Sequence, residues 1–323
     1  MLKISVLGSG RWGSLIAWYL NKIGYNVILW GKPDSIEIKT LIKNRNNGSV
    51  YFDEKVAITS ELTFALTSDL IVISINAQNL RIFLGYLIEF AKNKIDLSEK
   101  KIVLCMKGIE ESTGKRLTEI VHDFLPTNNK VAIWVGPGHV KSIVNGIPTC
   151  MVVDSLNNDL KFELAEIFSS ELIRCYFGND LIGNEIGAAS KNVFGIAAGI
   201  LDALDLDALK GPLMARGLKE ISILIEKMGG KKESACGLCH LGDYQATLFS
   251  KESNNRKFGE SLITGEITNF IAEGVGTSYA IKNICQKHKL NMPICHEIYK
   301  IITKRSTPEL SIKKLFMRNI CQE

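Results

Sequence analysis

Three glycines placed directly after a short apolar run constrain the fold of this chain more than any other feature. Residues 4–7 lead into Gly8-Ser-Gly10-Arg-Trp-Gly13, and a helix is predicted over residues 14–22. In a strand-turn-helix, such glycines allow a tight turn, close approach of the backbone to a pyrophosphate, and tight packing of helix on strand. Because the amino end of a helix attracts anions, the pattern predicts a dinucleotide-binding βαβ unit.

Short apolar runs alternate with helical stretches through the first half of the chain, which is typical of a parallel sheet with crossover helices. After residue 182 the β-branched runs fade and helical periodicity takes over. We therefore predict an α/β Rossmann-type doubly wound sheet in a dinucleotide-binding domain over 1–183, then an all-α substrate and catalytic domain over 184–323. The expected strands are 4–7, 27–30, 70–75, 102–106, 131–135, 150–153 and 173–177, and expected helices of the second domain are 213–228, 277–288 and 294–303.

Charge and hydropathy exclude several classes of protein. The net charge of +5 is spread along 323 residues, so nucleic-acid binding is not expected. The longest apolar stretch, residues 182–204, contains Glu185, Lys191 and Asn192, which predicts a buried helix rather than a membrane span. The glycine loop begins so early that no room is left for a leader, and we expect a cytoplasmic protein.

The eight cysteines show no paired spacing, and we expect them to be reduced. One cluster, Cys236-Gly-Leu-Cys239-His240, has the spacing of a c-type haem attachment site or of half a zinc site. Haem attachment of that kind requires export, and no second ligand pair lies at zinc-finger spacing. We interpret the match as a coincidence and expect no metal.

The end of the second predicted strand bears on the choice between NAD and NADP. Folds that prefer NAD usually place an acidic residue there, which bonds the ribose 2′-hydroxyl. This strand ends in Gly31-Lys32 instead, which removes a repulsion against the 2′-phosphate of NADP. Lys32 either attracts that phosphate or is an ordinary exposed lysine. We expect NAD or NADP to bind, with a slight preference for NADPH.

A helix face of small residues carries one lysine. Gly187, Lys191, Gly195 and Gly199 recur every four residues, so one side of the predicted helix allows a backbone or a cofactor to come close. Lysine is rarely fully buried without a partner. Lys191 therefore either pairs with an acid such as Asp243 or takes part in chemistry, and these alternatives remain open.

From the glycine loop to about Ile302, the sequence resembles the NAD(P)-dependent glycerol-3-phosphate dehydrogenases. The motifs that carry the resemblance occur in the order of that family: Gly8-x-Gly10-x-Trp12-Gly13, Lys107-Gly108, Gly136-Pro137, Glu185-x-Gly187-x-x-x-Lys191-Asn192, Arg216-Gly217-Leu218, Leu241-Gly242-Asp243, Asn255-Arg256 and Glu273-Gly274-Val275. The family interconverts dihydroxyacetone phosphate and sn-glycerol 3-phosphate by hydride transfer, usually for phospholipid synthesis. The resemblance implies the same small phosphorylated substrate here, and a homodimer is possible.

The resemblance also implies roles for individual residues. Lys191 corresponds to the catalytic acid/base and Lys107 to a second lysine near substrate and cofactor, while Asp243 and Asn255 bind substrate or hold those lysines. The catalytic residues expected are Lys191, Lys107 and Asp243. The cofactor contacts expected are Gly8, Gly10, Arg11, Trp12, Gly13, Lys32, Lys107, Val140, Ile271 and Glu273. The substrate contacts expected are Lys107, Gly136, Gly138, Lys191, Asp243, Ser253, Asn254, Asn255 and Arg256.

Two departures from the family pattern concern the substrate. Asn254 stands where the family has an arginine that grips phosphate, and Gly138 stands where it has a serine. An active enzyme for glycerol 3-phosphate is the leading hypothesis. The alternatives are a related dehydrogenase with another hydroxy or keto substrate, and a non-catalytic NAD(P)-binding protein. Lys107, Lys191 and Asp243 argue against the last, since a pure binding module needs none of them.

Overall fold

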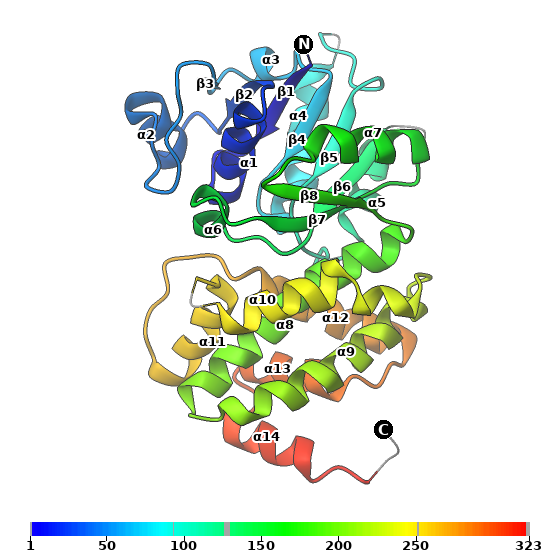
Figure 1. The fold of residues 1–323 in the computed structure, drawn as a ribbon. Helices are drawn as coiled ribbons and strands as arrows, with labels where there is room; N and C mark the ends of the chain where they lie inside the picture. Colours follow the sequence, from blue (N-terminus) through cyan, green and yellow to red (C-terminus); the bar gives the residue numbers. More distant parts are fainter. Residues whose placement is uncertain (1, 93, 126–129, 251, 321–323) are drawn as a thin grey trace. The chain divides into compact units, whose positions relative to one another are not determined.

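The computed structural model describes residues 2–92, 94–125, 130–250 and 252–320, and it divides into two compact units (Figure 1). Met1–Met106 and Leu117–Leu181 form the first unit, and Lys107–Arg116 and Ile182–Glu323 form the second. The segment Lys107–Arg116 was expected in the first domain. It groups with the second because Ile109 is part of that unit's hydrophobic core, Lys107 pairs with Asp243 and Arg116 pairs with Glu185.

An eight-stranded sheet forms the centre of the first unit, in the order β3-β2-β1-β4-β5-β6-β7-β8. All neighbours pair in parallel except β6 and β7, which are antiparallel. The connection between these two strands carries only a five-residue helix, α6 (Val140–Val144), whereas a parallel crossover usually needs a full helix. The strands are β1 (Lys3–Leu7), β2 (Asn26–Trp30), β3 (Ala57–Thr59), β4 (Leu70–Ile73), β5 (Lys101–Leu104), β6 (Val131–Val135), β7 (Thr149–Asp154) and β8 (Ile173–Phe177).

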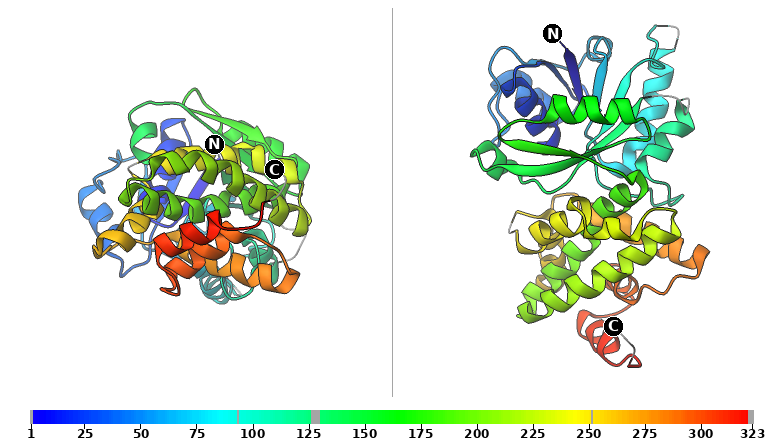
Figure 2. Two further views of the ribbon diagram at one scale, coloured as in Figure 1. Left: turned by 90° about the horizontal axis from the view of Figure 1, so that it is seen from below. Right: turned by 45° about the vertical axis from the view of Figure 1, so that its right-hand side comes forward.

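Helices α1 (Arg11–Lys22) and α7 (Asn158–Phe168) pack on the sheet through a shared aromatic cluster. Trp134 of β6 stacks on Phe168 with ring centroids 4.1 Å apart, and Tyr19 lies 5.9 Å from Trp134. The Tyr19 hydroxyl donates to the Phe168 carbonyl at 2.7 Å, which satisfies its polar atom inside the core. Figure 2 shows α7, in green, lying across the strands of its own unit. The other helices are α2 (Ile36–Asn44), α3 (Leu62–Ala65), α4 (Leu80–Ala91) and α5 (Leu117–Phe124).

Within the described residues, the second unit consists of helices and loops over 182–320, together with one isolated β-bridge between Ile109 and Arg116 in the segment Lys107–Arg116. Its central helix, α8 (Leu181–Ala203), is buried along most of its length, as its apolar composition predicts. No helix in the described ranges is both long enough and apolar enough to cross a bilayer. The other helices are α9 (Lys210–Lys227), α10 (Asp243–Phe249), α11 (Asn254–Thr264), α12 (Glu273–His288), α13 (Pro293–Ile302) and α14 (Pro308–Phe316), with a π-helical turn at Leu238–Gly242.

The small residues of α8 permit very close helix contacts, as their spacing predicts. A Cβ atom on Gly199 would lie 1.9 Å from the carbonyl oxygen of Arg256 in α11. A Cβ atom on Gly195 would lie 2.8 Å from the Thr247 side chain in α10. These glycines therefore bring α8 against both helices, and that approach carries Lys191 to the residues it contacts.

Candidate active site

Two of the three glycines after β1 are required by the packing of the loop itself. Gly8 has a φ of +127°, and a Cβ atom there would lie 2.1 Å from the Ser74 carbonyl oxygen. A Cβ atom on Gly13 would lie 1.9 Å from the Gly8 carbonyl oxygen. A side chain at Gly13 would force α1 away from the end of β1, and a side chain at Gly8 would clash with the backbone that follows β4. The two glycines therefore hold the strand-turn-helix together.

Gly10 has a different environment. An added Cβ atom would meet no heavy atom within 4 Å, so this residue leaves space beside the loop. Gly10 is also the N-cap of α1, where no side chain caps the helix. The amino end of α1 thus offers backbone amides beside an open backbone surface, which is the arrangement that a pyrophosphate needs. The residues present fit a bound dinucleotide.

Gly138 packs closely against the Trp12 ring. A Cβ atom on Gly138 would lie 2.9 Å from the edge of the Trp12 indole, so even a small side chain would crowd the ring. Gly136, two residues earlier, has a φ of +147°, which favours glycine. Val140 is buried at the start of α6. Trp12 and Gly138 therefore form one packed contact in the first unit.

The end of β2 has no space for an acidic side chain. A Cβ atom on Gly31 would lie 2.3 Å from the Ser9 hydroxyl oxygen and 2.8 Å from the Ile38 Cβ atom. Lys32 follows on the surface, and Arg11 is also exposed at the first residue of α1. The structure thus leaves no space for a carboxylate side chain at position 31, directly after this strand, and places a lysine next to it.

In the second unit, Lys191 and Lys107 share one carboxylate. Lys191 is only 8% exposed, and its ammonium donates to the Thr247 hydroxyl at 2.7 Å and lies 3.2 Å from Asp243 Oδ1. Lys107 donates to the other oxygen of Asp243. The Thr247 hydroxyl in turn donates to the Asp243 carbonyl oxygen at 2.7 Å. The three predicted catalytic residues are therefore brought together by α8, α10 and the segment Lys107–Arg116.

Burial sets the protonation behaviour of this lysine cluster, which we define as Lys107, Lys191, Asp243 and Thr247. Desolvation lowers the pKa of Lys191 to about 8, although Asp243 opposes the shift. Burial alone would raise the pKa of Asp243, but the two lysines outweigh it and lower that pKa. Lys191 can therefore exchange a proton near neutral pH, as an acid/base group requires, while Asp243 stays ionised.

A chain of amide contacts lies next to the lysine cluster. Asn255 Nδ2 donates to Asn192 Oδ1 at 3.0 Å, and the Gly274 amide donates to Asn255 Oδ1 at 2.9 Å. These bonds join α8, α11 and the first turn of α12. The Nδ2 group of Asn192 is buried and has no hydrogen-bond partner among the described residues. Asn192 thus presents an unused donor beside Lys191.

Glu273, the first residue of α12, is electrostatically coupled to both lysines. Desolvation raises its pKa to about 7, while Lys191 and Lys107 act to lower that pKa. Ile271, two residues earlier, is 62% exposed. Glu273 therefore adds a second acid to the environment of the cluster, and Ile271 lies on the surface of its unit.

The predicted phosphate loop forms the amino end of α11. Ser253 is the N-cap, and its hydroxyl accepts from the Arg256 amide at 3.3 Å. Asn254 is the first helical residue. The Arg256 guanidinium binds Asp202 and lies 3.1 Å from Glu260, so its charge is already paired within the unit. Lys251, another cation of this loop, lies outside the described residues.

His240 has a structural place in the π-helical turn before Asp243. Its Nδ1 atom lies 3.0 Å from the carbonyl oxygen of Gly187 on α8, and burial lowers its pKa to about 4. A Cβ atom on Gly187 would lie 2.9 Å from the His240 Cβ atom, so the glycine permits this contact. Cys236, by contrast, is exposed. No group of histidine, cysteine and acidic residues suited to a metal occurs in the described part of the chain.

Sequence reasoning assigned no role to Thr247, Asn192 or Arg116. Thr247 lies four residues after Asp243, so helical spacing could have placed both on one face. Arg116 forms a buried ion pair with Glu185, which ties the segment Lys107–Arg116 to α8. No local pattern links Arg116 to Glu185, because they lie 69 positions apart.

A Rossmann-type sheet with a glycine loop, and a helical unit with a buried lysine paired to a carboxylate, are the combination expected of a dinucleotide-dependent dehydrogenase. The family model described as NAD-dependent glycerol-3-phosphate dehydrogenase N-terminus matches residues 3–161, and the corresponding C-terminus model matches residues 180–313. The chain belongs to the NAD-dependent glycerol-3-phosphate dehydrogenase family. The family resemblance and the predicted fold class are thereby confirmed.

Similar proteins match this chain along almost its whole length. Glycerol-3-phosphate dehydrogenase [NAD(P)+] of Thermoanaerobacter sp. (strain X514) is 34% identical, and the alignment covers 98% of each chain. The solved structure of a glycerol-3-phosphate dehydrogenase from Coxiella burnetii has a TM-score of 0.89 at 27% identity, covering 98% of this chain and 99% of that one. A Plasmodium falciparum structure with a TM-score of 0.84 at 20% identity, covering 100% of this chain and 97% of that one, shares the fold.

Proposed function

We propose that this chain interconverts dihydroxyacetone phosphate and sn-glycerol 3-phosphate with NAD or NADP. The observation that carries the proposal is the buried Lys191, held by Asp243 and Thr247, in a chain of this family. The two alternatives, another hydroxy or keto substrate and a non-catalytic NAD(P)-binding protein, are not favoured by relatives that match along the full length.

Lys191 is the proposed acid/base group. A nicotinamide cofactor held by the glycine loop would supply a hydride for reduction at the substrate C2 carbon and would accept one in oxidation. In reduction, negative charge develops on the C2 oxygen; the Lys191 ammonium stabilises that charge and donates one proton to it. The resulting neutral amine regains its proton from water. Its pKa of about 8 suits both directions.

Asp243 and Lys107 position and tune that group. Asp243 holds Lys191 through one carboxylate oxygen and Lys107 through the other, so the two ammonium groups have defined places. Lys107 adds a second positive charge, which favours an oxygen that becomes negative. The free Nδ2 group of Asn192 is available to a substrate oxygen.

The amino end of α11 is the proposed site for the substrate phosphate. Residues 253–255 start this helix, where unpaired amides attract anions. Asn254 offers a neutral amide in place of the guanidinium fork, and Arg256 is paired with Asp202 and Glu260. The phosphate would therefore be held mainly by backbone and neutral side-chain donors. We propose weaker phosphate binding than an arginine at position 254 would give.

The cofactor would be held by the glycine loop, with Gly10 and the amino end of α1 at its pyrophosphate. The absence of space for an acid at Gly31, with Lys32 exposed beside it, supports a slight preference for NADPH. Steady-state kinetics with both cofactors, for wild type and Lys32→Ala, tests this preference. We expect Lys32→Ala to raise the Michaelis constant for NADPH and to leave that for NADH unchanged; a strong preference of the wild type for NADH would contradict it.

The activity itself is tested with purified protein, NADH or NADPH, and dihydroxyacetone phosphate, followed by absorbance at the nicotinamide band. We expect rapid, substrate-dependent oxidation of the cofactor. Dihydroxyacetone without phosphate and a 2-keto acid serve as comparison substrates. Turnover of the keto acid alone would favour the altered-substrate alternative, and no turnover with any of the three would favour the binding-protein alternative. A cytoplasmic location, a homodimer and the domain limits 1–183 and 184–323 stay predictions.

A further inference from the structure

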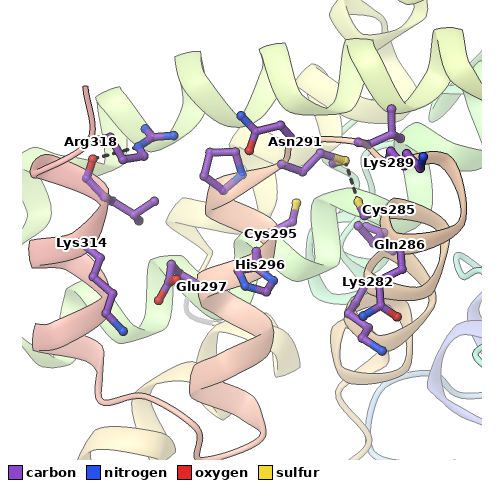
Figure 3. A pocket seen from close by; sticks show the side chains of 15 residues that line it. Lys282, Cys285, Gln286, Lys289, Asn291, Cys295, His296, Glu297, Lys314 and Arg318 are labelled. Carbon is purple, nitrogen blue, oxygen red and sulfur yellow. Dashed lines mark hydrogen bonds between the residues drawn. The ribbon is translucent and has the colours of Figure 1, made fainter. Parts of the chain in front are cut away.

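A pocket of about 490 Å³ lies among α12, α13 and α14 of the second unit (Figure 3). Its volume falls within the range of roughly 300–1,000 Å³ that is typical of small-molecule sites. The lining side chains come from the second half of α12, the loop before α13, the first turn of α13 and the last turn of α14 with Arg318 beyond it. None of the residues of the lysine cluster lines this pocket.

Most of the charged side chains in the lining of this pocket are positive. Lys282, Lys289, Lys314 and Arg318 all line it, and none of the four forms an ion pair with another described residue. Glu297 is the carboxylate of the described lining, and it is already neutralised by Lys300 at 2.7 Å. The pocket therefore carries an excess of positive charge that no neighbouring acid in its lining balances.

Acidic groups behind the lining do not fully balance this positive charge. The amino end of α13 opens at the pocket, but the amides of Ile294 and Cys295 donate to the buried Glu220 at 2.7 and 3.0 Å. Arg318 acts to lower the pKa of Glu220, although burial is the larger influence and raises it. Lys314 likewise acts to lower the pKa of Glu297, which Lys300 already pairs. Arg318 and Lys314 are thus each partly balanced by one acid, while Lys282 and Lys289 form no ion pair with a described residue.

Apolar side chains and neutral thiols make up most of the rest of the lining, together with Gln286, Asn291 and His296. Ile281 is 1% exposed and Met292 is 3% exposed, and Leu290, Pro293 and Leu315 lie beside them. The Cys285 thiol donates to the Met292 sulfur at 3.4 Å, and burial raises the pKa of Cys285 to about 11, so this thiol stays uncharged. The pocket thus combines an apolar surface with unpaired cations.

We propose that this pocket is a binding site for an amphiphilic anion, with a hydrocarbon body and a single carboxylate or phosphate head. The hydrocarbon body would lie against Ile281, Met292 and Leu315, where burial of apolar surface favours binding. The head would be held by Lys314 and Arg318, with Lys282 and Lys289 adding attraction. A small hydrophilic anion would leave the apolar surface unused, and a neutral lipid would leave the cations unused.

Calorimetric titration of the full chain tests the site with decanoate and decyl phosphate, below the concentration at which either forms micelles. Inorganic phosphate, decanol and octanoate are the comparison ligands. We expect one equivalent of either decyl anion to bind, and octanoate to bind about tenfold more weakly, since each buried methylene contributes to affinity. Phosphate and decanol should each bind at least tenfold more weakly than decyl phosphate.

Two variants locate the site. Lys314→Gln combined with Arg318→Gln should weaken decanoate binding about tenfold, because hydrogen bonds to a charged head are lost. Lys313→Gln is the matched control, since Lys313 lies on the same helix, is exposed and does not line the pocket. Its affinity should equal that of the wild type. Thermal unfolding of all three proteins checks that each is folded before binding is compared.

Three outcomes would overturn the proposal. Binding of several equivalents that is insensitive to both variants would mean adsorption to exposed apolar residues. Binding of inorganic phosphate as tight as that of decyl phosphate would mean a simple anion site. Sedimentation with phosphatidylglycerol vesicles, without binding of soluble decanoate, would mean that the cations of α14 serve a membrane surface instead. Because none of these measurements uses turnover, they are independent of the proposed catalytic activity.

Discussion

The glycine loop of the first unit and the lysine cluster of the second are suited to ligands by different means. At Gly10 the loop provides backbone amides and empty space, and no side chain takes part. The lysine cluster instead encloses charged side chains, so that burial and pairing set the pKa of Lys191. Binding at the glycine loop depends on the absence of a Cβ atom. The pKa of Lys191 depends instead on charged partners that are far apart in sequence. Substitutions in the two units should therefore have different effects.

The largest effect is expected from Lys191→Ala. Turnover should fall by about 100- to 10,000-fold, the usual contribution of a general acid/base group. The dissociation constant of NAD(P)H should stay unchanged, because the glycine loop lies in the other unit. Steady-state kinetics and cofactor fluorescence measure the two quantities. Lys287→Ala, at an exposed position of α12, is the control and should keep full activity. If Lys191→Ala retains more than a tenth of wild-type turnover, Lys191 is not the acid/base group.

Asp243→Asn tests the electrostatics of the lysine cluster. Reduction needs protonated Lys191, so its kcat/KM should fall as the pH rises through about 8, while oxidation should gain over the same interval. Asp243 is the strongest influence that raises the pKa of Lys191. Removing Asp243 should therefore shift the pH dependence of kcat/KM to lower pH in both directions. Because breaking a buried ion pair destabilises by roughly 3–5 kcal/mol, urea unfolding should also show a loss. If the pH dependence of kcat/KM in either direction keeps its wild-type midpoint, a group other than Lys191 is titrating.

The glycine loop offers a matched pair of alanine substitutions. Gly13→Ala places a methyl group against the Gly8 carbonyl and should lower the free energy of unfolding by about 1–3 kcal/mol. Gly10→Ala meets no protein atom and should change it by less than about 1 kcal/mol. The dissociation constant of NAD(P)H should nevertheless rise about tenfold in Gly10→Ala, because its methyl group occupies the space meant for pyrophosphate. Unchanged affinity in Gly10→Ala would place the cofactor elsewhere.

The last expected effect, at the amino end of α11, is limited to one kinetic constant. Asn254→Arg should lower the Michaelis constant for dihydroxyacetone phosphate by about tenfold, because a guanidinium adds charge-assisted bonds to phosphate. Asn269→Arg adds the same charge at an exposed position and is the control. Because Arg256 is paired with Asp202, the remaining sources of compensation are Lys257 and Lys251, and alanine at each position tests them. Equal Michaelis constants in all these proteins would move the phosphate site away from this loop.

Much of the first unit follows from local sequence patterns. The glycine spacing located the β1–α1 turn, and apolar runs located seven of the eight strands, because buried parallel strands are continuous apolar segments. Two features of the sheet were not predicted from these patterns. The short β3 has three partly buried residues without a clear apolar run, and the reversed direction of β7 depends on the connection through α6. Both are properties of pairing between strands rather than of single segments.

The sequence by itself determined that Lys191 lies on a helix face of glycines, and that such a lysine needs either an acidic partner or a role in the chemistry. It left the two alternatives open, and it placed Lys107 in the first domain. Only the tertiary structure decided that Lys107, Lys191 and Thr247 meet at Asp243, that Gly138 packs on Trp12, and that Arg256 is paired with Asp202. The physical reason is that helix and strand patterns arise from contacts between near neighbours in sequence. The pKa of a buried group, by contrast, depends on desolvation and charges supplied by segments that only folding brings together.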